Sequence, residues 1–171
     1  MFEVLAFVYE NYWGADSCPE FPTLQRKLNG LGFADHEVIA ALVWLEELRH
    51  ASHQVRQGTS LPDAAENTNA TAAGTDLWSP SAGAMRCFTD AEQGRLGAQG
   101  WGLLTFLIQA GALNPLQLEL VLERTLATPA SPLDLNDLKL VILMVYWSLG
   151  EEPDALVLDE LCDNHTDRLA I

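Results

Sequence analysis

Residues 137–149 read Asp-Leu-Lys-Leu-Val-Ile-Leu-Met-Val-Tyr-Trp-Ser-Leu, and this stretch decides the fold. After its first residue, only Lys139 and Ser148 interrupt a surface that is apolar on every side of a helix. A helix without a polar face lies inside a protein, surrounded by other elements. Gly150 follows as a stop signal. We therefore predict a central helix on which the rest of the chain packs.

Helices are also predicted on both sides of this stretch by apolar spacing and by local start and stop signals. The clearest starts are the capping-box spacing from Thr89 to Glu92, and Asn114 followed by Pro115. The alternation typical of strands is scarce, with one short hairpin conceivable at 85–88. We predict an all-α protein with a helix start at Thr89, helices at 2–13, 23–31, 35–50, 101–110, 115–127, 137–149 and 154–162, and Asp134 or Asn136 as the cap of the central helix.

The composition divides the chain into three segments. Residues 57–84 are rich in Ala, Thr, Asn, Gly and Ser and poor in large apolar side chains, which is typical of a flexible linker. We predict a three-helix N-terminal lobe at 1–56, the linker at 57–84, and a C-terminal helical lobe with an acidic tail at 85–171. Because a lobe of about 60 residues buries little surface alone, we expect the two lobes to share a core.

The chain is strongly acidic, with 24 Asp and Glu against 9 Lys and Arg and a formal net charge of −15. None of the three segments is basic. Nucleic-acid binding depends on Lys and Arg at the phosphates, so this balance disfavours direct contact with nucleic acid. An acidic surface suits a basic protein partner, for example a DNA-handling enzyme. The alternative is that the charge serves solubility alone.

The most acidic stretch begins at residue 151 and is our predicted contact with such a partner. Beyond residue 150 the chain has a single basic residue, Arg168. The carboxylates predicted to bind the partner are Glu151, Glu152, Asp154, Asp159, Glu160, Asp163 and Asp167.

Two segments share a layout typical of helix-turn-helix hairpins: helix, glycine, tight turn, and a helix capped by Asp or Asn. They run from Leu28 to Asp35 and from Leu107 to Asn114. If the helix after Asp35 entered a DNA groove, the phosphate contacts would be Arg26, Lys27, Arg49 and Arg56. That helix starts with acidic rather than basic residues, so an αα-hairpin that serves packing is the favoured interpretation.

No catalytic motif is recognisable. Nothing pairs a nucleophile with a base at an identifiable spacing. Gly94, Gly97, Gly100 and Gly102 lack the preceding strand and the lysine of a phosphate-binding loop, so we expect tight packing or a helix break there. We predict no catalytic residues and no cofactor.

The remaining thiols and imidazoles give no metal site either. His50 and His53 could join Cys162 and His165 only if distant parts of the chain met, so we predict no bound metal. Three widely spaced cysteines and no signal peptide indicate reduced thiols and a cytoplasmic location. The longest apolar run, Leu140–Trp147, is too short to span a membrane.

Several stretches resemble the bacterial Smg family, a domain of unknown function. This resemblance covers nearly the whole chain outside 52–84. Departures from the family pattern are a longer linker and Gln99-Gly-Trp101, where an arginine often precedes the glycine. The similar stretches are 1–10 (Met-Phe-Glu-Val-Leu-Ala-Phe-Val-Tyr-Glu), 28–45, 85–92, 102–107 and, most closely, 135–145 (Leu-Asn-Asp-Leu-Lys-Leu-Val-Ile-Leu-Met-Val).

The resemblance implies a link to DNA metabolism, because genes of this family often neighbour those for the DNA-processing protein A and for topoisomerase I or topoisomerase-like zinc-finger proteins. It implies no catalytic residues. We predict a non-enzymatic, acidic protein–protein interaction module, an accessory factor of DNA-processing or topoisomerase proteins. The alternatives are a helix-turn-helix nucleic-acid-binding or regulatory protein, and an enzyme of unknown type. The sequence leaves the oligomeric state open.

Overall fold

The computed structural model describes residues 1–12, 14–56, 87–129 and 133–162, and the regular structure in these ranges is helical. This confirms the predicted all-α class. Cys87 and Phe88 form no strand, and the rest of the expected hairpin at 85–88 lies outside the described ranges. The elements are α1 (Phe2–Asn11), a 3-10 turn η1 (Ala15–Ser17), α2 (Phe21–Gly30), α3 (Asp35–Arg56), α4 (Asp90–Gln109), α5 (Pro115–Leu126), α6 (Leu135–Leu149) and α7 (Ala155–Cys162).

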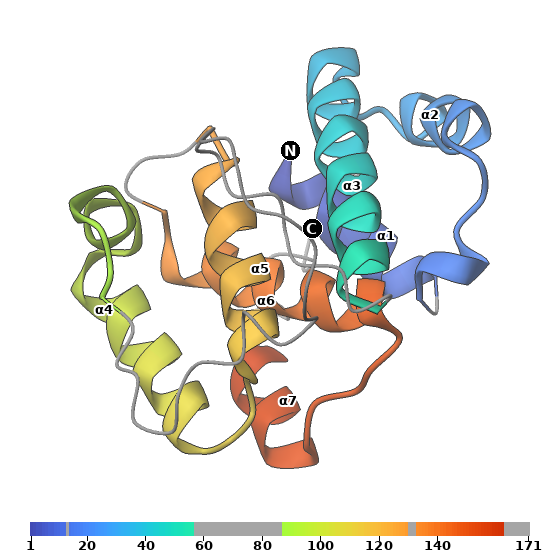
Figure 1. Ribbon diagram of the computed structural model, residues 1–171. Helices are drawn as coiled ribbons and strands as arrows, with labels where there is room; N and C mark the ends of the chain where they lie inside the picture. The colour runs from blue at the N-terminus through green and yellow to red at the C-terminus, as the bar shows by residue number, and fades with distance from the viewer. Residues whose placement is uncertain (13, 57–86, 130–132, 163–171) are drawn as a thin grey trace, which may run out of the picture.

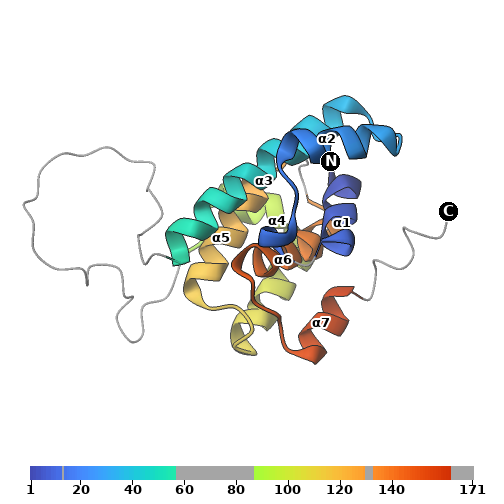
Figure 2. The same ribbon diagram turned by 90° about the vertical axis from the view of Figure 1, so that its right-hand side faces the viewer.

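The helix predicted to be central is α6, and it is central in the structure. Every side chain from Leu138 to Leu149 is buried. Helices α1, α3, α4, α5 and α7 all pack on it, while α2 packs on α3 (Figures 1 and 2). One continuous cluster of buried apolar residues extends from Val4 to Leu161. The division into two lobes around residues 57–84 stays a prediction, because that segment lies outside the described residues.

Lys139 and Ser148, which interrupt the buried apolar stretch of α6, have partners inside the fold. Lys139 is 4% exposed, and its ammonium donates to the backbone carbonyl of Glu160 at 2.6 Å and to the Glu160 carboxylate at 3.2 Å. The Ser148 hydroxyl lies 2.6 Å from that of Ser52 on α3. Because both polar groups are satisfied, an otherwise apolar helix tolerates them in its buried faces.

The local start signals form as predicted. Thr89 and Glu92 make a reciprocal capping box at the start of α4, and Asn114 and Gln117 make another at the start of α5. Of the two caps considered for α6, Asp134 accepts the hydrogen bond, so the helix begins at Leu135 rather than at residue 137. These caps satisfy backbone N–H groups that have no partner within the helix.

Three predicted boundaries differ in the structure, two of them because of tertiary contacts. Helix α1 ends two residues early because Tyr12 is extended and its carbonyl accepts from the Trp147 indole at 2.8 Å. Helix α2 begins at residue 21, since Pro22 is compatible with a first helical turn. Helix α3 continues past residue 50 to Arg56, where Ser52 is buried against α6 and Arg56 donates to the Ser148 carbonyl at 2.7 Å.

The glycines of α4 serve the two purposes expected of them. Gly97 breaks the helical path with φ of 64° and ψ of 178°, so the stretches on its two sides form one kinked helix. Gly100 faces α6: a Cβ atom on it would lie 3.0 Å from Leu138 Cδ2. The first glycine lets the chain bend, and the second lets α4 approach the central helix closely.

Helices α3 and α5 are joined by a buried polar contact. The Trp44 indole donates to the backbone carbonyl of Arg124 at 3.1 Å. The Arg124 guanidinium, itself almost fully buried, binds Glu47 at 2.8 Å and Glu123 at 2.7 Å. This contact fixes α5 against the middle of α3, and so positions the α4–α5 turn at the far end of α5.

Candidate protein-binding cleft

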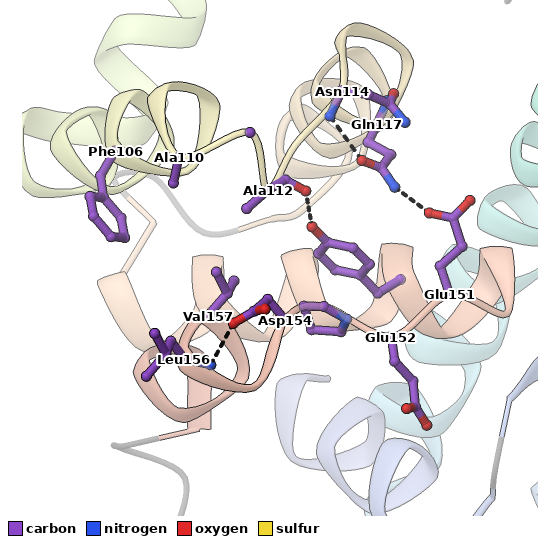
Figure 3. A pocket seen from close by; sticks show the side chains of 13 residues that line it. Phe106, Ala110, Ala112, Asn114, Gln117, Glu151, Glu152, Asp154, Leu156 and Val157 are labelled. Carbon is purple, nitrogen blue, oxygen red and sulfur yellow. Dashed lines mark hydrogen bonds between the residues drawn. The ribbon is translucent and has the colours of Figure 1, made fainter.

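A cleft of about 600 Å³ opens where the α4–α5 turn meets the α6–α7 connection (Figure 3). Segments far apart in the sequence form its two sides, and they are brought together because α4, α5 and α7 all pack on α6. The residues that line the cleft are Phe106, Ala110, Gly111, Ala112, Asn114, Gln117, Tyr146, Glu151, Glu152, Pro153, Asp154, Leu156 and Val157.

One end of the cleft is apolar and exposed. Phe106 of α4 and Leu156 of α7 project from opposite sides of this end, with Val157 beside Leu156 (Figure 3). Phe106 is 54% exposed and Leu156 is 81% exposed, although both are large apolar side chains. When a partner covers apolar surface in a concave site, removal of that surface from water stabilises the complex by about 25 cal/mol per Å².

Glu151 and Glu152 make the other end of the cleft acidic, while Asp154 lies beside Leu156 and Val157 (Figure 3). Glu151 is held in place, because the Gln117 side-chain amide donates to its carboxylate at 2.5 Å. Asp154 caps α7, where its carboxylate accepts from the Leu156 backbone N–H at 3.0 Å. Glu152 is exposed and makes no hydrogen bond or ion pair with any described residue. Of the three carboxylates, Glu152 is therefore the one whose two oxygens both lack a hydrogen bond to the described residues, while Glu151 and Asp154 each have one oxygen engaged.

Tyr146 connects the cleft to the central helix. Its hydroxyl donates to the backbone carbonyl of Ala112, which ties α6 to the α4–α5 turn. Burial raises the pKa of the Tyr146 hydroxyl above its ordinary value of 10.0, and the nearby Glu151 carboxylate raises it further. The hydroxyl is therefore protonated at neutral pH, and it stabilises the shape of the cleft as a hydrogen-bond donor.

The carboxylates dominate the charge of the cleft. Two helix N-termini, which favour anions, also end here: those of α5 and α7. Asn114 and Asp154 already accept from the N–H groups of these termini. Among the residues that line the cleft there are three carboxylates and no Lys or Arg. The cleft therefore favours a cation.

The cleft pairs no Ser, Cys or Lys nucleophile with a histidine base. Its lining contains no Ser, Cys, Lys or His, so it brings no activated nucleophile to a base. Elsewhere in the described ranges, no three His, Cys, Asp or Glu side chains are grouped as metal ligands. His165, one member of the ligand set considered above, lies outside those ranges. What the cleft offers chemically is apolar contact at one end and negative charge at the other.

The structure brings together three of the seven predicted partner-binding carboxylates: Glu151, Glu152 and Asp154. Glu160 does not line the cleft and forms an ion pair with Lys139 of α6 instead. Asp159 is exposed beside Cys162, and together with burial, the larger cause, it raises the pKa of that thiol. Asp163 and Asp167 lie outside the described residues. The predicted acidic contact is thus split, with its first three members in the cleft.

The four cations considered for nucleic-acid contact each have an internal partner. Arg26 donates to the Pro22 carbonyl at 3.3 Å, and Lys27 donates to the Tyr12 hydroxyl at 3.0 Å. Arg49 lies over the Phe21 ring, 5.6 Å from its centroid. Arg56 donates to α6, as described above, so it is tied to a different element from the other three. Nucleic-acid contact by these residues stays a prediction.

Sequence reasoning missed the apolar end of the cleft. Phe106 lies in the predicted helix 101–110, for which the sequence analysis gives no exposed face, and Leu156 lies within the stretch interpreted as acidic. A signal was present for Leu156: with Val157 and Leu161 buried in α7, helical spacing places Leu156 on a different face. No helix in the described part of the chain is long and apolar enough to cross a membrane.

Comparison with known proteins was made over the whole chain. The model of a family described as "Protein of unknown function (DUF494)" matches residues 1–171. A "Protein Smg homolog" from Methylibium petroleiphilum is 43% identical over 169 residues, 99% of each chain. Proteins of the same name are 39% identical in Leptothrix cholodnii, over 99% of each chain, and 37% identical in Herminiimonas arsenicoxydans, over 94% of this chain and 92% of the relative. No solved structure matches the chain.

Proposed function

This chain belongs to the Smg family, whose function is unknown, and we propose that it is a non-enzymatic interaction module that binds a basic protein. The cleft between the α4–α5 turn and the α6–α7 connection is the proposed contact. The proposal is supported by one observation above all: exposed Phe106 and Leu156 share a concave surface with Glu151, Glu152 and Asp154.

Each end of the cleft contributes differently to binding. Burial of the apolar end supplies affinity, because it removes exposed carbon surface from water. The acidic end selects a cationic partner and speeds the encounter, an effect reinforced by the net charge of −15. An interface of this kind needs no catalytic group, which agrees with the lining of the cleft.

A DNA-handling enzyme is our proposed class of partner. Such enzymes carry basic surfaces for the phosphate backbone, and those surfaces are complementary to an acidic cleft. The gene neighbourhood implied by the family resemblance favours the same class. In this account the protein is an accessory factor that contacts the enzyme and not the nucleic acid.

The test is affinity capture with the tagged full-length chain from lysate, with and without nuclease, followed by purification of the recovered partner. We expect recovery of a basic protein that resists nuclease, and a dissociation constant that rises as salt increases from about 50 mM to about 300 mM. If recovery disappeared with nuclease, or if the purified protein bound equally well at both salt concentrations, the proposed function would be wrong.

A further inference from the structure

We infer that the cleft recognises a short amphipathic segment that presents a leucine-sized apolar side chain and an arginine or lysine on one face. This inference rests on the proposed function and adds to it the chemistry of the recognised segment. The apolar side chain lies between Phe106 and Leu156, and the cation lies at Glu152. The sequence of the segment, rather than the net charge of its protein, then determines recognition.

The apolar end requires an apolar side chain from the partner. Leu156 is the most exposed large apolar residue among those described, at 81%, and Phe106 faces it across the cleft. A cation alone would leave both side chains in water. An aliphatic or aromatic side chain between them covers both, and such a central apolar contact usually dominates binding energy.

The acidic end requires a cation within reach of Glu152. Glu151 and Asp154 each have one oxygen engaged, by Gln117 and by the start of α7, whereas Glu152 makes no hydrogen bond or ion pair with the described residues and only a repulsive electrostatic contact with the Tyr9 hydroxyl. A neutral or acidic segment would desolvate these carboxylates without compensating them. Arginine or lysine gives Glu152 a charge-assisted hydrogen bond, with Glu151 and Asp154 adding longer-range attraction.

The apolar and acidic ends of the cleft are separate, so they also fix how the bound segment must space its apolar and cationic side chains. Figure 3 shows Phe106 and Leu156 at one end of the cleft and Glu151 and Glu152 at the other. The segment must therefore place its apolar and cationic side chains side by side, as residues three or four apart do on a helix. A segment with scattered positive charges lacks this arrangement, and the cleft discriminates against it.

The test is selection of random peptides of about 12 residues displayed on phage, with the full-length chain as target. We expect enrichment of peptides that combine Arg or Lys with a large apolar residue at a fixed spacing. Enriched peptides are then synthesised and their dissociation constants measured for four variants. Leu156→Ser and Glu152→Gln change the cleft, while Leu31→Ser and Glu20→Gln make the same changes at exposed positions next to α2, away from the cleft.

We expect Leu156→Ser to weaken binding about tenfold and Glu152→Gln about fivefold, with less than about twofold change for the two controls. Enriched peptides without a basic residue, no enrichment, or equal losses in the cleft and control variants would each overturn the inference. Binding of the purified partner to the same variants shows whether the inference alone fails or the proposed function fails with it. If a basic partner bound the Leu156→Ser and Glu152→Gln variants as tightly as the unchanged chain, the inferred recognition at the cleft would be wrong, and binding of a basic protein would stand.

Discussion

Gln117 and Glu151 lie 34 positions apart and join the start of α5 to the α6–α7 connection, with the Gln117 amide donating to the Glu151 carboxylate at 2.5 Å. The carbonyl oxygen of the same amide accepts from the Asn114 backbone N–H at 2.9 Å. Gln117 therefore serves both its own helix and the acidic end of the cleft. The contact with Asn114 needs a hydrogen-bond acceptor and the contact with Glu151 needs a donor, and only an amide side chain supplies both.

Because Gln117 makes both contacts, we expect glutamate at this position to destabilise the fold, although glutamate is common at this position of a capping box. Gln117→Glu keeps the acceptor for Asn114 but sets a second carboxylate against Glu151. We expect the free energy of unfolding to fall by about 1–2 kcal/mol near neutral pH, measured by urea denaturation. The same substitution at exposed Gln99 is the control, with an expected change below about 0.5 kcal/mol.

Acidification distinguishes charge repulsion from a loss of packing in the Gln117→Glu variant. Near pH 4, protonation of one carboxyl restores a donor between the two residues, so the difference from the unchanged chain should narrow. A deficit that is the same near pH 4 and pH 7 would contradict the proposed hydrogen bond to Glu151.

Gly100 and Gly102 on α4 provide a paired test of helix packing. A Cβ at Gly100 lies 3.0 Å from Leu138 Cδ2, whereas a Cβ at Gly102 has no atom within 4 Å. Both positions gain helical propensity from alanine, by up to about 1 kcal/mol. We expect Gly102→Ala to stabilise the fold by about 0.5–1 kcal/mol, and Gly100→Ala to destabilise it by about 1 kcal/mol. Thermal denaturation in parallel measures both, and equal stabilisation would show that α4 is farther from α6 than described.

The raised pKa of the Tyr146 hydroxyl leads us to expect a lower free energy of unfolding at high pH. Its pKa in the folded state lies above 10.0, chiefly because of burial, so folding favours the protonated hydroxyl. The stability it contributes is complete below about pH 10 and is lost as the pH rises through the folded-state pKa. We expect the difference in unfolding free energy between the unchanged chain and Tyr146→Phe to stay constant up to about pH 10 and to shrink between about pH 10 and pH 12. A difference that stays constant over this range would contradict the assigned direction of the shift.

The features of the fold that could be predicted from sequence are those written in neighbouring residues. The apolar surface of 137–149 identified the central helix, Thr89 and Glu92 form the expected capping box, and Asn114 caps α5 as expected. The missed ends of α1 and α3 depend on distant partners instead. Helix α3 extends to Arg56 because Ser52 meets Ser148, 96 positions away, and no local pattern encodes that contact.

Only the part of the candidate site that has a local sequence signal could be predicted. Glu151, Glu152 and Asp154 stood out as consecutive acids, which is a local signal. Phe106 faces Leu156 only after α4 and α7 have packed on α6, so their shared cleft is a tertiary property. An apolar residue in a helix is usually assigned to the core, and exposure is what distinguishes these two.

The most direct test of the central claim is nuclear magnetic resonance titration of the isotope-labelled full-length chain with an acetylated and amidated alanine-rich peptide of about 12 residues that carries one Leu four residues before one Arg, with the same peptide carrying Glu in place of Arg as the matched probe. The account predicts that the arginine probe shifts backbone amides at Gly111, Glu152 and Leu156 and saturates near about 1 mM, while the glutamate probe leaves them unchanged. Equal shifts with both probes, or shifts confined to residues outside the cleft, would contradict recognition of a basic amphipathic segment at this site.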